Sequence, residues 1–388
     1  MLSLLNTAFP ENSNRKSTPP EKSDEYRVFQ FPRNRIPVIN GDTKDWDIVP
    51  ESYWYTTKDL IAHLDEGNAS VDPKDLDVRV RAGWVKGLNR LYILYEVYDD
   101  YWDFERDKTK QRINDIFELV IDGDLSGGPF INNPEVPLQG KALREPSYIP
   151  VFLNFAGVHA QNYHIFVPAK DTDFGLVWGA QPWIAQFPYA NFAYSGSVEH
   201  GKSGSMVMEC WITPFDHAPA SGPSDAVVTQ LRENAFIGLC WGILDYDYGE
   251  DKPKRSSIAS DFAMVKDADY LRRFRLMPIE PELRKSIEAD FTFTLIDPAA
   301  GKVQFHDRSY GKITKWQWDF GDGTTSEEQH PRHSYKEPGV RYVVKLTVTG
   351  ASGKDTLIRY WEVHIPYISS NKEESHDGNL QTQHNRDL

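Results

Sequence analysis

A tight turn between two apolar strands is encoded in residues 316–326, which read WQWDFGDGTTS. Asp322 and Gly323 stand between alternating apolar residues, and glycine accepts the positive φ that a short hairpin requires. Trp318 is expected to point into the core of a β-sandwich. The next alternating run, YVVKLTV at residues 342–348, predicts a further strand. This part of the chain is therefore predicted to be a small antiparallel sandwich.

The same run, with HSY at residues 333–335 and PG at residues 338–339 after it, is similar to the PKD domain family. The resemblance implies an immunoglobulin-like sandwich. It also implies an appended, extracytoplasmic module beside a domain that degrades polysaccharide or protein. His306, His330 and His333 are expected to be satisfied or exposed histidines rather than a metal cluster.

Alternation with a period of two dominates the preceding residues as well, as in RLYILYEVY at residues 90–98. Short helices are predicted only at residues 57–64 and 225–233. The opening INGDTKDW at residues 39–46 and the strand DIFELVID at residues 115–122 resemble the β-sandwich of family-9 carbohydrate-binding modules and DOMON domains. The predicted fold class is therefore all-β, with a large sandwich of this kind followed by a small immunoglobulin-like PKD sandwich.

Five segments are predicted along the 388 residues. They are a disordered leader (1–25), the large sandwich (26–277), a linker (278–288), the PKD domain (289–367) and a disordered tail (368–388).

Composition limits the partners and the compartment. The formal net charge is −14 and no long Lys/Arg block occurs, so nucleic acid is not expected as a partner. No apolar run reaches the length of a membrane-spanning helix. Residues 1–10 lack the features of a signal peptide, so the expected periplasmic or secreted location depends on the PKD resemblance. Cys210 and Cys240 could form one disulfide or remain buried thiols.

Residues 154–194 depart from a plain binding module because they are rich in aromatic, amide and histidine side chains. The expected substrate-binding residues are Trp84, Tyr163, Trp178, Gln181, Trp183 and Asn191. The expected catalytic residues are His159 or His164 as the base, Tyr189 as the acid and Arg81 as the clamp on a carboxylate. Tyr163 and His164 are neighbours on a strand and must face opposite sides, so only one of them can line the site.

Acidic residues gather at one expected end of the sandwich: Asp99, Asp100, Asp115, Asp122 and Asp124. Such oxygen ligands suit Ca²⁺. A structural calcium ion held by Asp99, Asp122 and Asp124 is therefore expected, with solvated turn carboxylates as the alternative, and no cofactor is required for catalysis.

The pairing of this sandwich with a PKD domain resembles proteins of marine bacterial systems that degrade anionic algal polysaccharides such as ulvan. The resemblance implies a dehydratase that leaves a 4,5-unsaturated uronic acid at the non-reducing end of an oligosaccharide. The alternatives are a non-catalytic carbohydrate-binding protein, in which Trp178, Trp183 and Tyr189 stack on sugars, and a haem-binding protein. Glycoside hydrolysis would need a carboxylate pair, for which Glu118 and Glu209 are the candidates.

Overall fold

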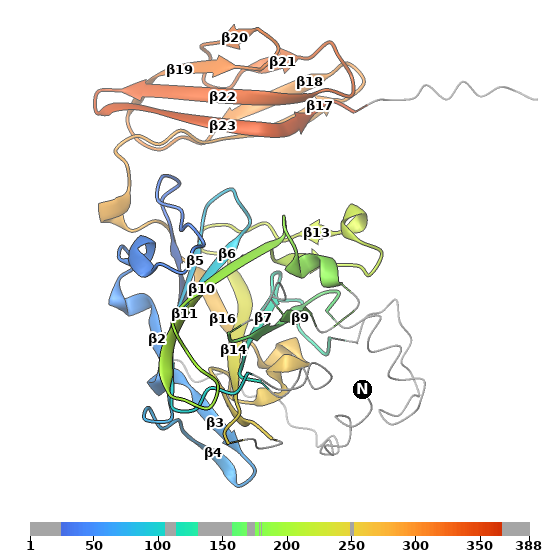
Figure 1. The fold of residues 1–388 in the computed structure, drawn as a ribbon. Helices are drawn as coiled ribbons and strands as arrows, with labels where there is room; N and C mark the ends of the chain where they lie inside the picture. Colours follow the sequence, from blue (N-terminus) through green and yellow to red (C-terminus); the bar gives the residue numbers. More distant parts are fainter. Residues whose placement is uncertain are drawn as a thin grey trace, which may run out of the picture. The chain divides into compact units, whose positions relative to one another are not determined.

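The computed structural model describes residues 25–104, 114–130, 157–168, 175–177, 179, 181–248 and 252–366 (Figure 1). The chain divides into two compact units at the junction of Glu282 and Leu283, within the expected linker. The described residues form β-strands and short 3-10 helices but no α-helix. The predicted all-β fold class is thus confirmed.

The large unit contains two sheets, which we call sheet I and sheet II. In sheet I, alternate residues of two long central strands, such as Val80 and Ile93, point into the main core and are fully buried. The hydrogen-bonded order of sheet I is β10 (Ala190–Ser195), β11 (Gly204–Ile212), β6 (Leu91–Asp99), β5 (Leu76–Trp84) and β1 (Tyr26–Gln30), with β2 (Trp54–Thr56) also on β5.

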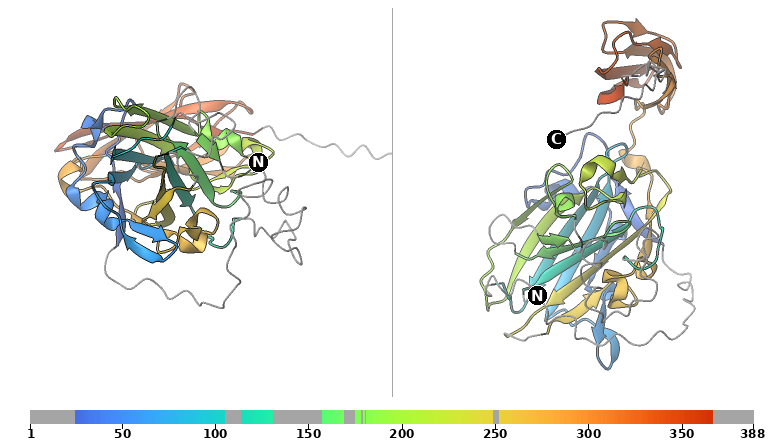
Figure 2. Two further views of the ribbon diagram at one scale, coloured as in Figure 1. Left: turned by 60° about the horizontal axis from the view of Figure 1, so that its bottom comes forward. Right: turned by 90° about the vertical axis from the view of Figure 1, so that its right-hand side faces the viewer.

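Sheet II is centred on β14 (Phe236–Asp245), whose long apolar run pairs with strands on both of its edges (Figure 2). One edge carries β7 (Ile116–Asp122), β8 (Gln161–Phe166) and β9 (Gly175–Val177). The other carries β16 (Arg272–Leu276) and, farther along, β15 (Lys254–Ser257), β3 (Ile61–Leu64) and β4 (Gly67–Ser70). Every residue of β7 is buried, so this strand is covered on both faces.

Strand β1 connects the two sheets. Its first residues, Tyr26 to Val28, pair in parallel with β16, and Phe29 and Gln30 pair in parallel with β5. The sheets therefore share one strand and enclose one apolar core, which includes Trp84, Tyr163 and Trp241.

The INGDTKDW motif anchors a covering segment on the outer face of sheet I. Gly41, at φ +81°, donates its N–H to Glu209 Oε2 over 2.7 Å, and Trp46 Nε1 donates to Glu209 Oε1 over 2.8 Å. Glu209 is fully buried, so the motif satisfies a carboxylate that would otherwise be costly to bury. This motif therefore contributes to the stability of the fold.

The short helices predicted at residues 57–64 and 225–233 are not α-helices. The first range instead holds the 3-10 helix η4 (Thr57–Asp59) and strand β3, because an edge of sheet II is available for pairing. The second range begins at the end of η7 (Pro223–Asp225) and contains β13 (Val227–Val228), which pairs with β12 (Phe215–His217). No helix in the described part of the chain is long and apolar enough to cross a membrane.

The described residues also form the 3-10 helices η2 (Thr43–Trp46), η3 (Glu51–Tyr53), η6 (Pro182–Ala185), η8 (Phe262–Val265), η9 (Ala268–Tyr270) and η10 (Pro281–Leu283).

Cys210 and Cys240 are buried free thiols, which decides between the two alternatives left open for them.

The small unit is a separate sandwich with its own core. Trp318 is fully buried there, as predicted, and Gly323 adopts φ +86° in the turn after it. His333 Nε2 lies 2.7 Å from Asp322 Oδ2, so this histidine is satisfied by a turn carboxylate. One sheet contains β17 (Phe291–Asp297), β18 (Lys302–Asp307) and β21 (Arg332–Ser334); the other contains β20 (Thr325–Ser326), β19 (Ile313–Asp319), β22 (Arg341–Gly350) and β23 (Gly353–His364).

Candidate functional site

A row of polar residues crosses the outer face of sheet II. Strand register places Gly242 opposite both Ser257 on β15 and Glu118 on β7, and Glu118 opposite His164 on β8. Residues opposite each other in antiparallel strands point to the same face. The flanking Leu119 lies in the main core, so the row faces away from that core. We call Ser257, Gly242, Glu118 and His164 the sheet II row.

Glu118 and His164 form a buried acid–imidazole pair. Nδ1 of His164 lies 2.8 Å from Oε1 of Glu118, and each side chain is only 4% exposed. The edge of the His164 ring also meets Phe166, with ring centroids 5.6 Å apart. A carboxylate at one ring nitrogen fixes the orientation and tautomer of the imidazole and stabilises the protonated ring. The pair therefore has the arrangement that acid–base chemistry requires.

Gly242 allows η8 to lie directly on the sheet. A Cβ at this position would come within 2.6 Å of Met264 Cε and 2.9 Å of Phe262 Cε2. The carbonyl of Val265, the last residue of η8, accepts a hydrogen bond from Asn162 Nδ2 over 3.1 Å. The glycine and this hydrogen bond together position η8 across the row.

A second polar pair and two cations flank η8. His63 Nε2 lies 2.7 Å from Ser257 Oγ, and burial, as the largest cause, lowers the pKa of His63, which favours its neutral form. Arg255 is exposed, is in register with Leu244, and holds its guanidinium 5.8 Å from the Phe262 ring centroid. Lys266 is exposed directly after η8. This face thus carries local positive charge in a chain whose formal net charge is −14.

The four predicted catalytic residues do not converge. His164 is in the sheet II row, whereas His159 precedes β8 and meets the Phe130 ring edge-on at 6.1 Å. Tyr189 packs against the Trp183 ring at 5.1 Å. Arg81 lies on the outer face of sheet I, on the opposite side of the core.

Arg81 is already engaged where it lies. Its guanidinium is 2.9 Å from Glu96 Oε2 and stacks 4.0 Å from the Trp54 ring centroid. Glu209 is also on the outer face of sheet I and Glu118 on that of sheet II, so these two carboxylates cannot flank one glycosidic bond.

The predicted substrate-binding residues are also dispersed. Trp84 and Tyr163 belong to the main core and cannot contact a ligand, because the alternation of β5 and β8 turns them inward. Gln181 is fully buried, Trp183 is half-buried with Nε1 bonded to the Pro219 carbonyl, and Asn191 is exposed on edge strand β10. Trp178 lies outside the described residues.

Several residues of this face were not among the predicted site residues, namely Asn162, Ser257, Arg255 and His63. Glu118 was named only as one carboxylate of a glycosidase pair with Glu209, not as the partner of His164. The available signal was a lone carboxylate in the otherwise apolar run IFELVI, since buried carboxylates are rare unless paired.

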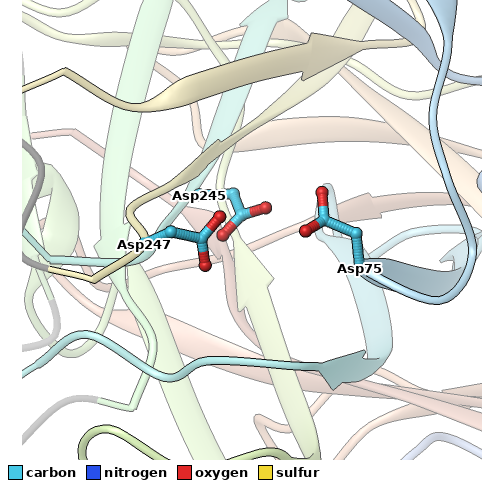
Figure 3. A group of neighbouring side chains, drawn as sticks. All are labelled: Asp75, Asp245 and Asp247. Atoms are coloured by element: carbon cyan, nitrogen blue, oxygen red, sulfur yellow. The ribbon is translucent and has the colours of Figure 1, made fainter.

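A second candidate centre lies at one end of the sandwich, where strands of both sheets end or begin. Six aspartates meet there, and we call them the acidic end cluster: Asp75, Asp99, Asp100, Asp115, Asp245 and Asp247. Figure 3 shows the carboxylates of Asp75, Asp245 and Asp247 turned toward one another. Burial, followed by the charges of neighbouring aspartates, raises the pKa of Asp245 to about 8.

Asp99 belongs to this cluster, but the other predicted calcium ligands do not. Asp122 is the last residue of β7, whereas Asp115 immediately precedes its first residue, so the two lie about 20 Å apart. The Asp122 carboxylate accepts hydrogen bonds from the N–H groups of Gly127 and Ser126, and Asp124 also bonds to the Ser126 N–H. Asp122 and Asp124 therefore stabilise a loop at the opposite end of the strand.

The small unit is similar to known PKD domains. Residues 281–363 match the family model of the PKD domain. Collagenase ColA of Bacillus cereus is 44% identical over 59 residues, which are 14% of this chain and 6% of the collagenase. The PKD1 domain of the Vibrio cholerae metalloprotease PrtV is 31% identical, with 21% of this chain and 99% of that one covered and a TM-score of 0.19.

The large unit is similar to a family-9 carbohydrate-binding module from Caldicellulosiruptor kristjanssonii, solved with cellotriose. The identity is 11%, the match covers 67% of this chain and 97% of that chain, and the TM-score is 0.41.

Proposed function

We propose that this chain is an extracytoplasmic, carbohydrate-active protein whose large unit removes water from a uronic acid at the non-reducing end of an oligosaccharide, such as one derived from ulvan. The observation that supports the proposal most directly is the buried Glu118–His164 pair, with 2.8 Å between Oε1 and Nδ1, on a face flanked by Arg255 and Lys266. A proton-transfer pair and positive charge on the same face of sheet II suit an anionic substrate that carries an acidic C–H bond.

The reaction requires a base near the carbon next to the uronate carboxylate. His164 removes the proton from C5, the electron pair of that C–H bond forms the C4–C5 double bond, and the C4–O4 bond breaks toward oxygen. The imidazolium then returns the proton to O4, so water leaves and the imidazole is regenerated. Glu118 stabilises the intermediate imidazolium, and one histidine can serve as both base and acid.

Negative charge moves onto the uronate carboxylate as the C5 proton leaves. A nearby cation favours this state over the substrate, and such electrostatic stabilisation is commonly a large contribution to catalysis. Arg255 and Lys266 therefore take the part of carboxylate clamp that the sequence had suggested for Arg81. Arg255 suits the role because a guanidinium can hold a carboxylate through two parallel hydrogen bonds.

The test is incubation of the purified chain with ulvan oligosaccharides, following the ultraviolet absorbance of the conjugated product and the loss of one water by mass spectrometry. We expect His164→Ala to reduce the rate by about 100-fold or more, as for loss of a general base. Glu118→Gln and Arg255→Gln should both reduce kcat, because each removes a charge that stabilises a state formed only during the reaction.

His159→Ala is the matched control, because it removes a histidine that lies outside the row. The proposal is wrong if the parent protein binds these oligosaccharides but forms no unsaturated product, or if His164→Ala and His159→Ala behave alike.

Non-catalytic carbohydrate binding is the second candidate, and an aromatic group favours it. Trp183, Tyr189 and Phe215 pack edge to face, and Phe187 beside them is 79% exposed. Sugars bind to such apolar rings. Phe187→Ala would then weaken binding of oligosaccharides, measured by calorimetry, in a protein that yields no product.

A further inference from the structure

The carboxylates of the acidic end cluster are spaced to surround one cation. Three groups of aspartates, namely Asp75 with Asp245 and Asp247, Asp99 with Asp115 and Asp245, and Asp99 with Asp100 and Asp247, each offer oxygens that lie within 4.8 Å of one another. Oxygens that coordinate one Ca²⁺ ion are each about 2.4 Å from it, so two of them can be at most about 4.8 Å apart. The observed spacing therefore meets this geometric limit.

Buried oxygens within the cluster lack protein partners. Asp245 is 3% exposed, and its Oδ1 has no hydrogen-bond donor among the described residues. The same holds for Oδ1 of Asp247, which is also 3% exposed. Figure 3 shows that the Asp245 carboxylate projects into the space between Asp75 and Asp247. A buried ionised carboxylate without a donor is costly, so these atoms indicate a missing positive ligand.

Protein cations balance only part of this charge. Lys254 Nζ lies 2.6 Å from Asp75 Oδ1 and 2.5 Å from Asp247 Oδ2, at the exposed rim. Asp115 is satisfied differently, because its two oxygens accept the N–H groups of Tyr246 and Asp103. The centre around Asp245 and Asp99 is left with the greatest excess of negative charge.

We propose that the acidic end cluster is a calcium site that joins the two sheets of the large unit. Its ligands are all carboxylate oxygens, which hard cations prefer. Zinc sites usually contain imidazole or thiolate ligands, and the three groups of carboxylates contain neither. Ca²⁺ accepts six to eight oxygens in flexible geometry, whereas Mg²⁺ usually retains several waters. A crowded set of six aspartates therefore favours Ca²⁺.

The site would connect elements that the chain brings together only on folding. Asp75 and Asp99 lie beside β5 and β6 of sheet I, whereas Asp115 and Asp245 lie beside β7 and β14 of sheet II. Bound calcium would hold the two sheets together at this end. It would also hold Asp115, which lies three residues before Glu118 and immediately before β7.

The experiment is isothermal titration calorimetry of the full chain with CaCl₂ after removal of metals by EDTA, with thermal unfolding measured in parallel. We expect saturable binding, a higher Tm in CaCl₂, and weaker binding of MgCl₂. Asp245→Asn should weaken calcium binding at least tenfold, and Asp100→Asn, at the less buried rim, provides the same test if Asp245→Asn does not fold.

Asp124→Asn is the matched control, because it removes an exposed aspartate from the opposite end of β7. It should bind calcium as the parent does. Absence of calcium binding by the parent, or an Asp124→Asn affinity as low as that of Asp245→Asn, would overturn the proposal. Both tests are independent of activity on carbohydrates.

Discussion

Without divalent cations, the large unit should become less stable as the pH rises from about 5 to about 8. Asp99 is 2% exposed, and its pKa is raised from the ordinary 3.8 to about 7. The folded protein therefore binds a proton that the unfolded chain has already released at these pH values. Stability falls with rising pH wherever the folded state binds more protons. The stabilisation is complete below about pH 4 and is lost as the pH rises through about 7.

The magnitude follows from the shift. A pKa difference of one unit between the folded and unfolded states corresponds to about 1.4 kcal/mol. The pH range from about 5 to about 7 spans about two of these units, so the unfolding free energy should fall by roughly 3 kcal/mol across it. Burial is also the largest cause of the raised pKa of Asp245, and the charge of Asp99 comes second, so the two titrations depend on each other and their contributions are not added. Asp99→Asn removes this titration and should flatten the pH dependence by about this amount.

The assay is urea unfolding of the full chain in EDTA at several pH values, comparing the parent with Asp99→Asn. Titration of the histidines is common to both proteins and cancels in the difference. Excess CaCl₂ should abolish the parent's decline, since a divalent ion stabilises the ionised cluster. The reasoning is refuted if the parent's stability is constant or rises over this range, or if Asp99→Asn retains the full decline.

Three further substitutions test the structural roles of Glu209, Trp318 and Gly242. Glu209→Gln should destabilise the protein by about 1 to 3 kcal/mol, because a neutral amide cannot accept from both Trp46 and the backbone N–H groups that the carboxylate now satisfies; unchanged urea unfolding would contradict this. Trp318→Ala should cost the small unit about 3 to 5 kcal/mol in calorimetry, as expected for a fully buried tryptophan, and loss of product formation in this variant at a temperature where the large unit stays folded would be unexpected. Gly242→Val should displace Met264 and lower product formation by on the order of 100-fold, so an unaltered rate would show that η8 has no role in positioning the site.

Local sequence predicted those features that depend only on neighbouring residues. The Asp322-Gly323 turn and the burial of Trp318 follow from glycine conformation and apolar alternation. Alternation also placed Tyr163 and His164 on opposite faces of one strand, and the structure confirms this.

Positions near strand ends were predicted less completely. Asp99, Asp100 and Asp115 were expected at one end of the sandwich, and they meet there. Asp122 was wrongly grouped with them, because residues 115–122 form one extended strand and its two ends lie at opposite ends of the sandwich. Asp75, Asp245 and Asp247 join the cluster from strands that are distant in sequence, so no local pattern connected them.

The sequence by itself therefore determined most of the strand content and the face toward which each strand side chain points, since these follow from turn chemistry and a two-residue period. The PKD module was indicated by resemblance to that family, and residues 281–363 match its model. Only the tertiary structure decided which strands became neighbours. That choice put Glu118 beside His164, placed Arg81 on the far side of the core, and gathered six aspartates at one end. The physical reason is that pairing between distant strands is selected by burial of the whole core, and alternation within one strand carries no information about its partner.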